Sequence, residues 1–189
     1  NSIISVSSGT VLSGSSVVAT LQARDAAGNN LSTGTATVVF SHTGGTSTGS
    51  FSATVDVTNG TYTSNFTGIS AGSATSIRAT VNGVSVATTL PTVAVLPGPI
   101  SPVTSTISLS NSTVQSGSSI TATLSARDAA GNTITTGGSS VVFSHSGGSS
   151  TGSFAGTNDP GDGTYSSVFT GIVAGTPTTV SATINGVSV

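Results

Sequence analysis

The stretch "ARDAAGN" occurs twice in this sequence, at Ala23–Asn29 and at Ala126–Asn132. Each copy is followed, at matching distances, by "VVFSH", "STGSF", "GTY", "FTGI" and "NGVSV". The two copies are about 103 residues apart throughout. Aligned without a gap, Asn1–Val86 and Thr104–Val189 share about 54 of 86 positions. A repeat of this length indicates two copies of a whole domain.

The composition excludes several classes of function. Only 4% of the residues are charged and the net charge is −2, whereas about 25% of residues are charged in ordinary domains. Three scattered arginines do not provide the basic surface that nucleic acids or anionic membranes require. No apolar run is long enough for a membrane helix. The absence of cysteine rules out disulfides and thiolate metal sites, and it points mildly to a bacterial or archaeal surface protein.

Period-two alternation predicts an all-β fold. In "SVVATLQARD", the residues Val17, Ala19 and Leu21 alternate with positions that vary between the copies, as expected for half-buried strands. Glycine-rich and Asn-Gly turns separate seven or so such segments per copy, which is typical of an antiparallel β-sandwich. The predicted core residues are Leu21, Phe40, Tyr62 and Phe66 in the first copy and Leu124, Phe143, Tyr165 and Phe169 in the second.

The repeat predicts two immunoglobulin-like sandwiches, at residues 1–97 and 104–189, joined by a stiff Pro-rich linker at residues 98–103. Thr89–Leu96 alternates like a closing strand that pairs back across the Asn82-Gly83 turn, and Pro91 would confine it to a sheet edge or a bulge. The second copy stops where the counterpart of this strand would begin, so its last strand is expected to be missing or truncated. Either the fragment comes from a longer array of repeats, or another chain supplies the strand.

The candidate chemical residues have simple structural explanations. His42 and His145 occupy the same position in both copies, with no carboxylate nearby in sequence, so we expect imidazoles that bond to the backbone. The aspartate of "DAAGN" could bind calcium, but that ion needs six to eight oxygen ligands. We therefore favour a turn in which the carboxylate accepts backbone N–H groups. The residues of the two predicted turns are Asp25, Gly28, Asn29, Asp128, Gly131 and Asn132.

One further acidic segment, "NDPGDG", brings Asn158, Asp159 and Asp162 together in the second copy only. It is a weak candidate for a cation site, and a polar hairpin loop is the favoured interpretation. The sequence contains no phosphate-binding glycine motif and no recognisable catalytic constellation. We therefore expect no cofactor, no catalytic residues and no enzymatic activity.

The segments "ARDAAGN", "VVFSHTGGTSTGSF", "NGTYTSNFTGISAG" and "IRATVNGVSV" resemble the bacterial immunoglobulin-like repeats of the invasin and intimin group. The "GTY" motif is also similar to filamin-type repeats. The resemblance covers nearly the whole chain and implies tandem domains of a large surface adhesin, most of which act as spacers. It implies an extracellular or cell-surface location.

Three functions remain open at this stage. The leading hypothesis is a structural stalk whose partners are neighbouring repeats or other copies of the protein. The second is a filament assembled by strand donation, with Val180, Ala182 and Ile184 as the candidate acceptor edge. The third is direct adhesion to a host surface protein or glycan, which would need exposed aromatic or apolar residues.

Overall fold

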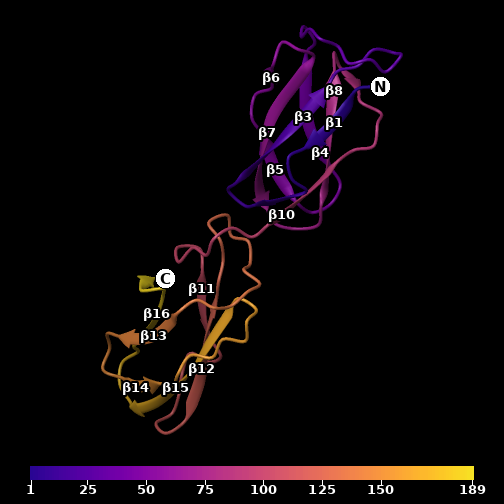
Figure 1. Cartoon of the computed structure of the whole chain (residues 1–189). Coiled ribbons are helices and arrows are strands. Elements are labelled where there is room, and N and C mark those ends of the chain that lie inside the picture. Colours follow the sequence, from indigo (N-terminus) through magenta and orange to yellow (C-terminus); the bar gives the residue numbers. More distant parts are fainter. The chain divides into compact units, whose positions relative to one another are not determined.

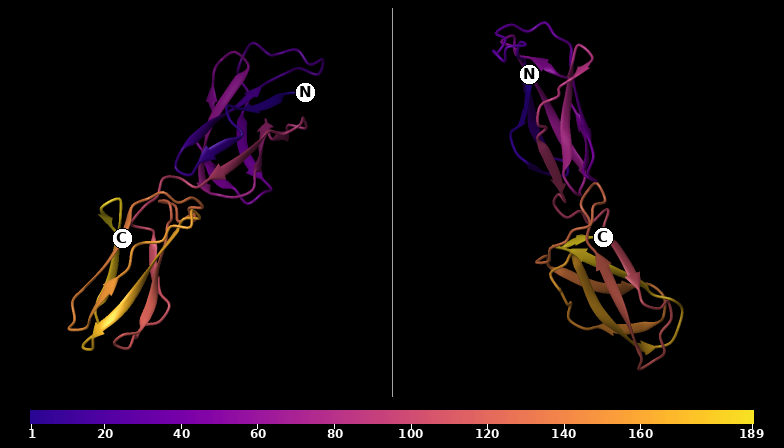
Figure 2. Two further views of the ribbon diagram at one scale, coloured as in Figure 1. Left: turned by 60° about the horizontal axis from the view of Figure 1, so that its bottom comes forward. Right: turned by 90° about the vertical axis from the view of Figure 1, so that its right-hand side faces the viewer.

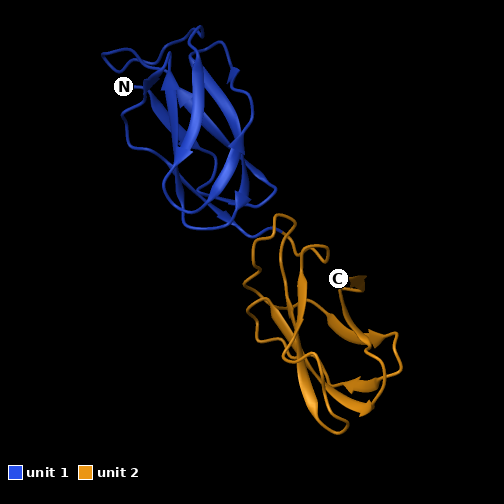
Figure 3. Ribbon diagram, turned by 180° about the vertical axis from the view of Figure 1, so that it is seen from behind, with its two compact units in different colours: residues 1–98 blue, residues 99–189 orange.

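The computed structural model describes all 189 residues, and its regular elements are β-strands only. The chain divides into two compact units, Asn1–Gly98 and Pro99–Val189 (Figure 3). It has no helix that is long and apolar enough to cross a membrane. Each unit is an immunoglobulin-like β-sandwich, so the all-β fold class predicted from the period-two alternation is confirmed.

The first sheet of unit 1 has the order β1-β3-β7-β5, with β6 also paired to β7 (Figure 1). Its strands are β1 (Ile3–Val6), β3 (Ser16–Gln22), β5 (Thr48–Phe51), β6 (Val55–Asp56) and β7 (Thr61–Ser70). In the antiparallel β3–β7 ladder, Leu21 lies opposite Tyr62, and Val17 lies opposite Phe66. These four side chains are buried, because residues two apart along a strand point to the same face.

The second sheet of unit 1 has the order β2-β10-β8-β4, with β9 also paired to β8. Its strands are β2 (Thr10–Leu12), β4 (Val38–Thr43), β8 (Thr75–Val81), β9 (Val84–Ser85) and β10 (Thr92–Leu96). Asn82 and Gly83 join β8 to β9 with φ angles of 49° and 81°, as a two-residue hairpin turn with positive φ at both positions requires.

The closing strand differs from its prediction. β9, not Thr89–Leu96, pairs across the Asn82-Gly83 turn. β10 lies inside the sheet in regular register, parallel to β2 and antiparallel to β8. The expectation that Pro91 confines this strand to a sheet edge or a bulge is therefore wrong. The reason is that β10 begins at Thr92, so Pro91 lies outside the strand. Pro91 contributes only its carbonyl oxygen, which accepts a 2.9 Å hydrogen bond from the N–H of Ile77.

The core of unit 1 lies between its two sheets (Figure 2). Its largest fully buried apolar side chains are Tyr62, Phe66, Leu21, Ile77, Val93 and Val95. The hydroxyl of Tyr62 accepts hydrogen bonds from the N–H groups of Thr35 and Ala36, at 3.1 and 3.0 Å. The phenol is therefore buried with its polar end satisfied. In unit 2, Tyr165 accepts a bond of 3.1 Å from Ser139 in the same way.

Unit 2 repeats this arrangement with fewer strands. One sheet is β11-β12-β15-β14 and the other is β13-β16-β17. The strands are β11 (Thr106–Leu109), β12 (Ser119–Ser125), β13 (Val141–Ser146), β14 (Thr151–Phe154), β15 (Thr164–Val173), β16 (Thr179–Ile184) and β17 (Val187–Ser188). Residues 113–115, which correspond to β2, form no strand. In unit 1 the only ladder partner of β2 is β10, and the counterpart of β10 would lie beyond Val189.

The segment predicted as the linker contains residues that pair within unit 2. Ile100 forms an isolated β-bridge with Asp128, and the N–H of Ser101 donates to the carbonyl of Arg127 at 2.7 Å. The carbonyl of Ser101 in turn accepts from the hydroxyl of Ser105 at 2.8 Å. The compact units accordingly divide between Gly98 and Pro99.

Candidate functional site

The two "DAAGN" segments form closed polar turns. The N–H and the side-chain amide of Asn29 donate to the two carboxylate oxygens of Asp25, at 2.9 and 3.0 Å. Gly28 has a φ of 91°, a left-handed conformation that glycine adopts without strain. The side-chain amide of Asn29, followed by its N–H, lowers the pKa of Asp25 below its ordinary value, because both donors favour the ionised carboxylate.

The turn in unit 2 has the same bonds, but its aspartate is buried. Asp128 is 1% exposed, and its Oδ1 accepts from the N–H groups of Ala130 and Asn132 at 3.0 and 2.8 Å. Its Oδ2 accepts from the side-chain amide of Asn132 at 2.8 Å. The hydroxyl of Thr104 donates to the Asp128 carbonyl at 2.7 Å. Both carboxylate oxygens are thus committed to the protein's own N–H groups, which gives this aspartate a structural role.

In the "NDPGDG" loop, the two aspartates accept hydrogen bonds from different groups of the protein. Asp159 accepts from the N–H groups of Gly138 and Gly161, at 2.7 and 2.9 Å. Asp162 accepts from the hydroxyl and the N–H of Thr164, and these two bonds lower its pKa below the ordinary value. Asn158 pairs through its backbone with Ser166. No cluster of three or more His, Cys, Asp or Glu side chains that could hold a metal ion is found in the chain.

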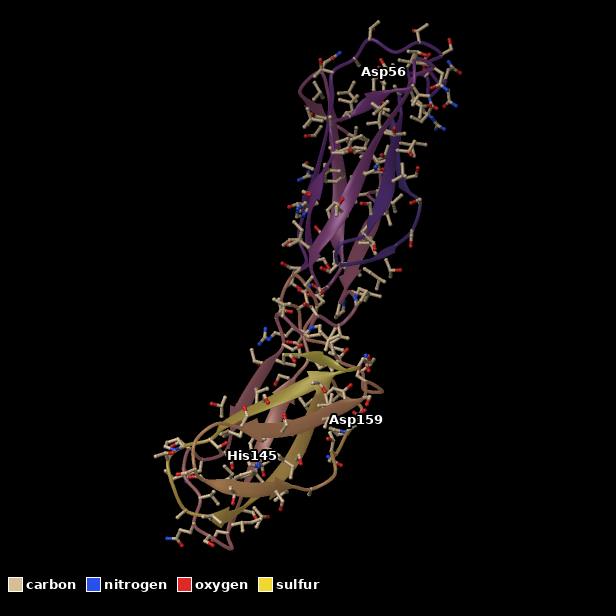
Figure 4. The ribbon with its side chains drawn as sticks, turned by 90° about the vertical axis from the view of Figure 1, so that its left-hand side faces the viewer. Asp56, His145 and Asp159 are labelled. Carbon is tan, nitrogen blue, oxygen red and sulfur yellow. The ribbon has the colours of Figure 1, made fainter.

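The histidines pack against phenylalanines at the ends of β4 and β13. His42 Nδ1 lies 3.1 Å from Thr75 Oγ1, and the imidazole makes an edge contact with Phe66 at a centroid distance of 5.5 Å. His145 repeats both contacts, and its Nε2 also lies 3.0 Å from the carbonyl oxygen of Gly152. Figure 4 shows His145 well away from Asp159 within unit 2. These contacts make each imidazole a hydrogen-bonded part of the sandwich.

The structure brings together one group of residues of which the sequence had singled out only Val180. An open groove of about 220 Å³ runs along one side of unit 2. We define the open groove by Val114, Ser116, Ser150, Gly171, Gly175 and Val180, with further lining from neighbouring residues. Its volume is below the roughly 300–1,000 Å³ of typical small-molecule sites.

The open groove includes only one residue of the predicted acceptor edge. Val180 lines it and is half-buried. Ala182 and Ile184 are each 1% exposed, and their part of β16 is paired with β17 and with the N–H of Val189. The uncovered edge is therefore the beginning of β16, around Thr178 and Val180. The missing counterpart of Thr89–Leu96 indicated an uncovered edge at Val180, but no local sequence signal indicated the other groove residues, which come from distant segments.

Comparison with known proteins gives one family and several similar structures. The family model "Invasin, domain 3" matches residues 1–98 and 101–189 separately. The chain is similar to the structure of FdeC, an Escherichia coli adhesin, with 28% identity and a TM-score of 0.58 over 99% of this chain and 60% of that one. It is also similar to invasin, a bacterial integrin-binding protein, with 19% identity and a TM-score of 0.58 over 99% of this chain and 37% of that one. The chain thus spans less than two thirds of either structure. No curated protein sequence matches it significantly.

Proposed function

The chain belongs to the invasin domain 3 family over both of its units, and we propose that these units are stalk segments of a bacterial cell-surface adhesin, without catalytic activity. The observation that carries the proposal is that the family model matches each unit separately. Two copies of one sandwich, each with its own core, form the repeating unit that a spacer needs.

The polar chemistry of the units supports a structural role. The acidic turns and both imidazoles are bonded within the sandwich, as their contact distances show. The surface carries hydroxyl groups and few charges. Such a surface is hydrated but has little electrostatic repulsion, which suits side-by-side packing in a cell-surface coat.

Direct adhesion by these units to a host protein or glycan is the alternative that the adhesin neighbours suggest. Binding hot spots are enriched in exposed aromatic side chains. Here the large exposed apolar residues are all aliphatic, whereas the phenylalanines and tyrosines are buried or half-buried in the cores. Adhesion therefore receives less support from the surface than the stalk role does.

Binding assays and single-molecule force measurements distinguish the stalk role from direct adhesion. The purified chain, immobilised at increasing density, should show no saturable binding to host cells, purified integrins or a glycan array. In single-molecule force measurements it should unfold in two discrete steps, one for each unit. Saturable binding that depends on named surface residues would replace the stalk proposal with adhesion by the units themselves.

A further inference from the structure

The chain contains three Asn-Gly dipeptides, Asn59-Gly60, Asn82-Gly83 and Asn185-Gly186. Such a dipeptide is prone to lose the side-chain amide of its asparagine, because glycine leaves its own backbone nitrogen unhindered. In this reaction the glycine nitrogen attacks the side-chain carbonyl carbon, Cγ, of the asparagine. The attack requires Cγ to lie over the asparagine's own next peptide bond, and the structure distinguishes the three sites in this respect.

Two of the asparagines are tied to a distant segment. Asn82 Oδ1 accepts a 2.8 Å hydrogen bond from the N–H of Thr37, and the N–H of Asn82 donates to the Thr37 carbonyl at 2.8 Å. Asn185 forms the same two bonds with Ser140, at 2.9 and 2.8 Å. Moving either Cγ onto the following nitrogen would break a hydrogen bond between two parts of the sandwich, which costs free energy before the reaction begins.

Asn59 is bonded differently. It is exposed, its φ is negative, and its Oδ1 accepts from the N–H of Thr61, two residues further on, at 3.0 Å. This bond curls the side chain over the peptide between Asn59 and Gly60, so it holds Cγ beside the nitrogen that attacks it. The Thr61 N–H also points at the oxygen on which negative charge develops during the attack.

Unit 2 carries the product of the reaction at the same position. Asp162 corresponds to Asn59 in the repeat alignment. Its Oδ1 accepts from the N–H of Thr164 at 2.9 Å, which is the same bond that Asn59 accepts from the N–H two residues further on. The backbone also matches, since the φ angles of Gly60 and Gly163 are 78° and 83°. The turn therefore accepts an aspartate here with its backbone and its hydrogen bond unchanged.

We propose that Asn59 is a site of spontaneous deamidation. The Gly60 nitrogen forms a bond to Asn59 Cγ, its proton passes to Nδ2, and the Cγ–Nδ2 bond breaks to release ammonia. Water then opens the five-membered imide, which leaves an aspartate or an isoaspartate, and no other co-reactant is needed. The reaction adds one negative charge to a chain whose net charge is −2, so aged copies repel one another more than new copies do.

The test is incubation of the intact chain at pH 8 and 37 °C, followed by digestion with pepsin and mass spectrometry of the peptides. Deamidation appears as a gain of about one mass unit. We expect Asn59 to react about tenfold faster than Asn82 or Asn185, because only these two must first break a hydrogen bond to another segment. In guanidinium chloride the three sites should react at similar rates, since the turns that distinguish them are lost.

Two variants are the controls. Asn59→Gln lengthens the side chain by one methylene group, so the ring would need six members and this site should stop reacting while Asn82 and Asn185 react as before. Asn59→Asp installs the product directly. It should elute with the aged chain in ion-exchange chromatography and change the melting temperature of unit 1 by less than about 3 °C.

Three results would overturn the proposal. The first is an Asn59 that keeps its amide in the folded chain and loses it only in guanidinium chloride, since the turn would then protect the residue. The second is an equal rate at the three sites of the folded chain, since the dipeptide alone would then set the reactivity. The third is a large fall in the melting temperature of unit 1 in Asn59→Asp, since the turn would then not accept the product.

Discussion

Asp25 and Asp128 occupy the same turn in the two units, yet only Asp128 is buried. The cause lies outside the motif, because Ile100 and Thr104 contact Asp128 through its backbone. Replacing a buried carboxylate that accepts several N–H bonds leaves those donors unsatisfied. Identical residues in identical turns can therefore differ in their contribution to stability.

Asp128→Ala should lower the free energy of unfolding of unit 2 by about 2–3 kcal/mol, because buried N–H donors lose a charged acceptor. Asp25→Ala is the matched control in unit 1, and it should cost much less because water can replace the lost bonds. Urea unfolding of the intact chain, followed by NMR signals from each unit, measures both effects. Equal losses in the two variants would contradict the role assigned to burial.

The lowered pKa values of Asp25 and Asp162 predict a dependence of stability on acid pH. A carboxyl group whose folded pKa lies below its unfolded value of about 4 stabilises the fold above that pH. This contribution is lost as the pH falls from about 4 through the folded pKa. Asp25→Asn should flatten the acid-side slope for unit 1 alone, and Asp162→Asn should do so for unit 2 alone. Urea midpoints between pH 2.5 and pH 6 test this, and unchanged slopes would count against it.

At the scale of elements, β10 is the strand that distinguishes the two units. Its Val95 is 1% exposed and packs over Gly68, whereas Val39 on β4 is 55% exposed. Val95→Ala should therefore lower the free energy of unfolding of unit 1 by about 2 kcal/mol, since it leaves a cavity in the core. Val39→Ala should change it by less than about 0.5 kcal/mol. Denaturant midpoints of the first unit are the measurement, and similar values for both variants would mean that β10 is not packed as described.

The individual strands were predictable, but their partners were not. β3 is predictable from its own residues, because burial of one face of a strand makes apolar side chains recur at every second position. The turn at Asn82-Gly83 was equally predictable, since positive φ selects those residues. The position of β10 between β2 and β8 depends on contacts between residues far apart in the chain, which no local pattern records. The repeat comparison predicted a missing strand beside Val180, which lines the open groove. The other walls escaped prediction, since they come from segments far apart in sequence.

At the scale of the whole molecule, two sequences that share about 54 of 86 positions form two cores of different completeness. The core of unit 1 includes Val93 and Val95, both fully buried. The core of unit 2 has no corresponding residues, and Ile120 and Val180 are half-buried there, compared with 6% and 0% exposure for Val17 and Ile77. Burying one valine side chain contributes about 1.5–3 kcal/mol, so unit 2 should be the less stable unit.

Calorimetry of the intact chain should show two transitions, with unit 2 melting on the order of 10 °C below unit 1. Val95→Ala assigns them, because it should lower only the upper transition, whereas Asp128→Ala should lower only the other. A single cooperative transition, or an upper transition that belongs to unit 2, would show that the less complete core of unit 2 does not limit its stability. Other contacts in unit 2 would then supply the stability that β10 supplies in unit 1.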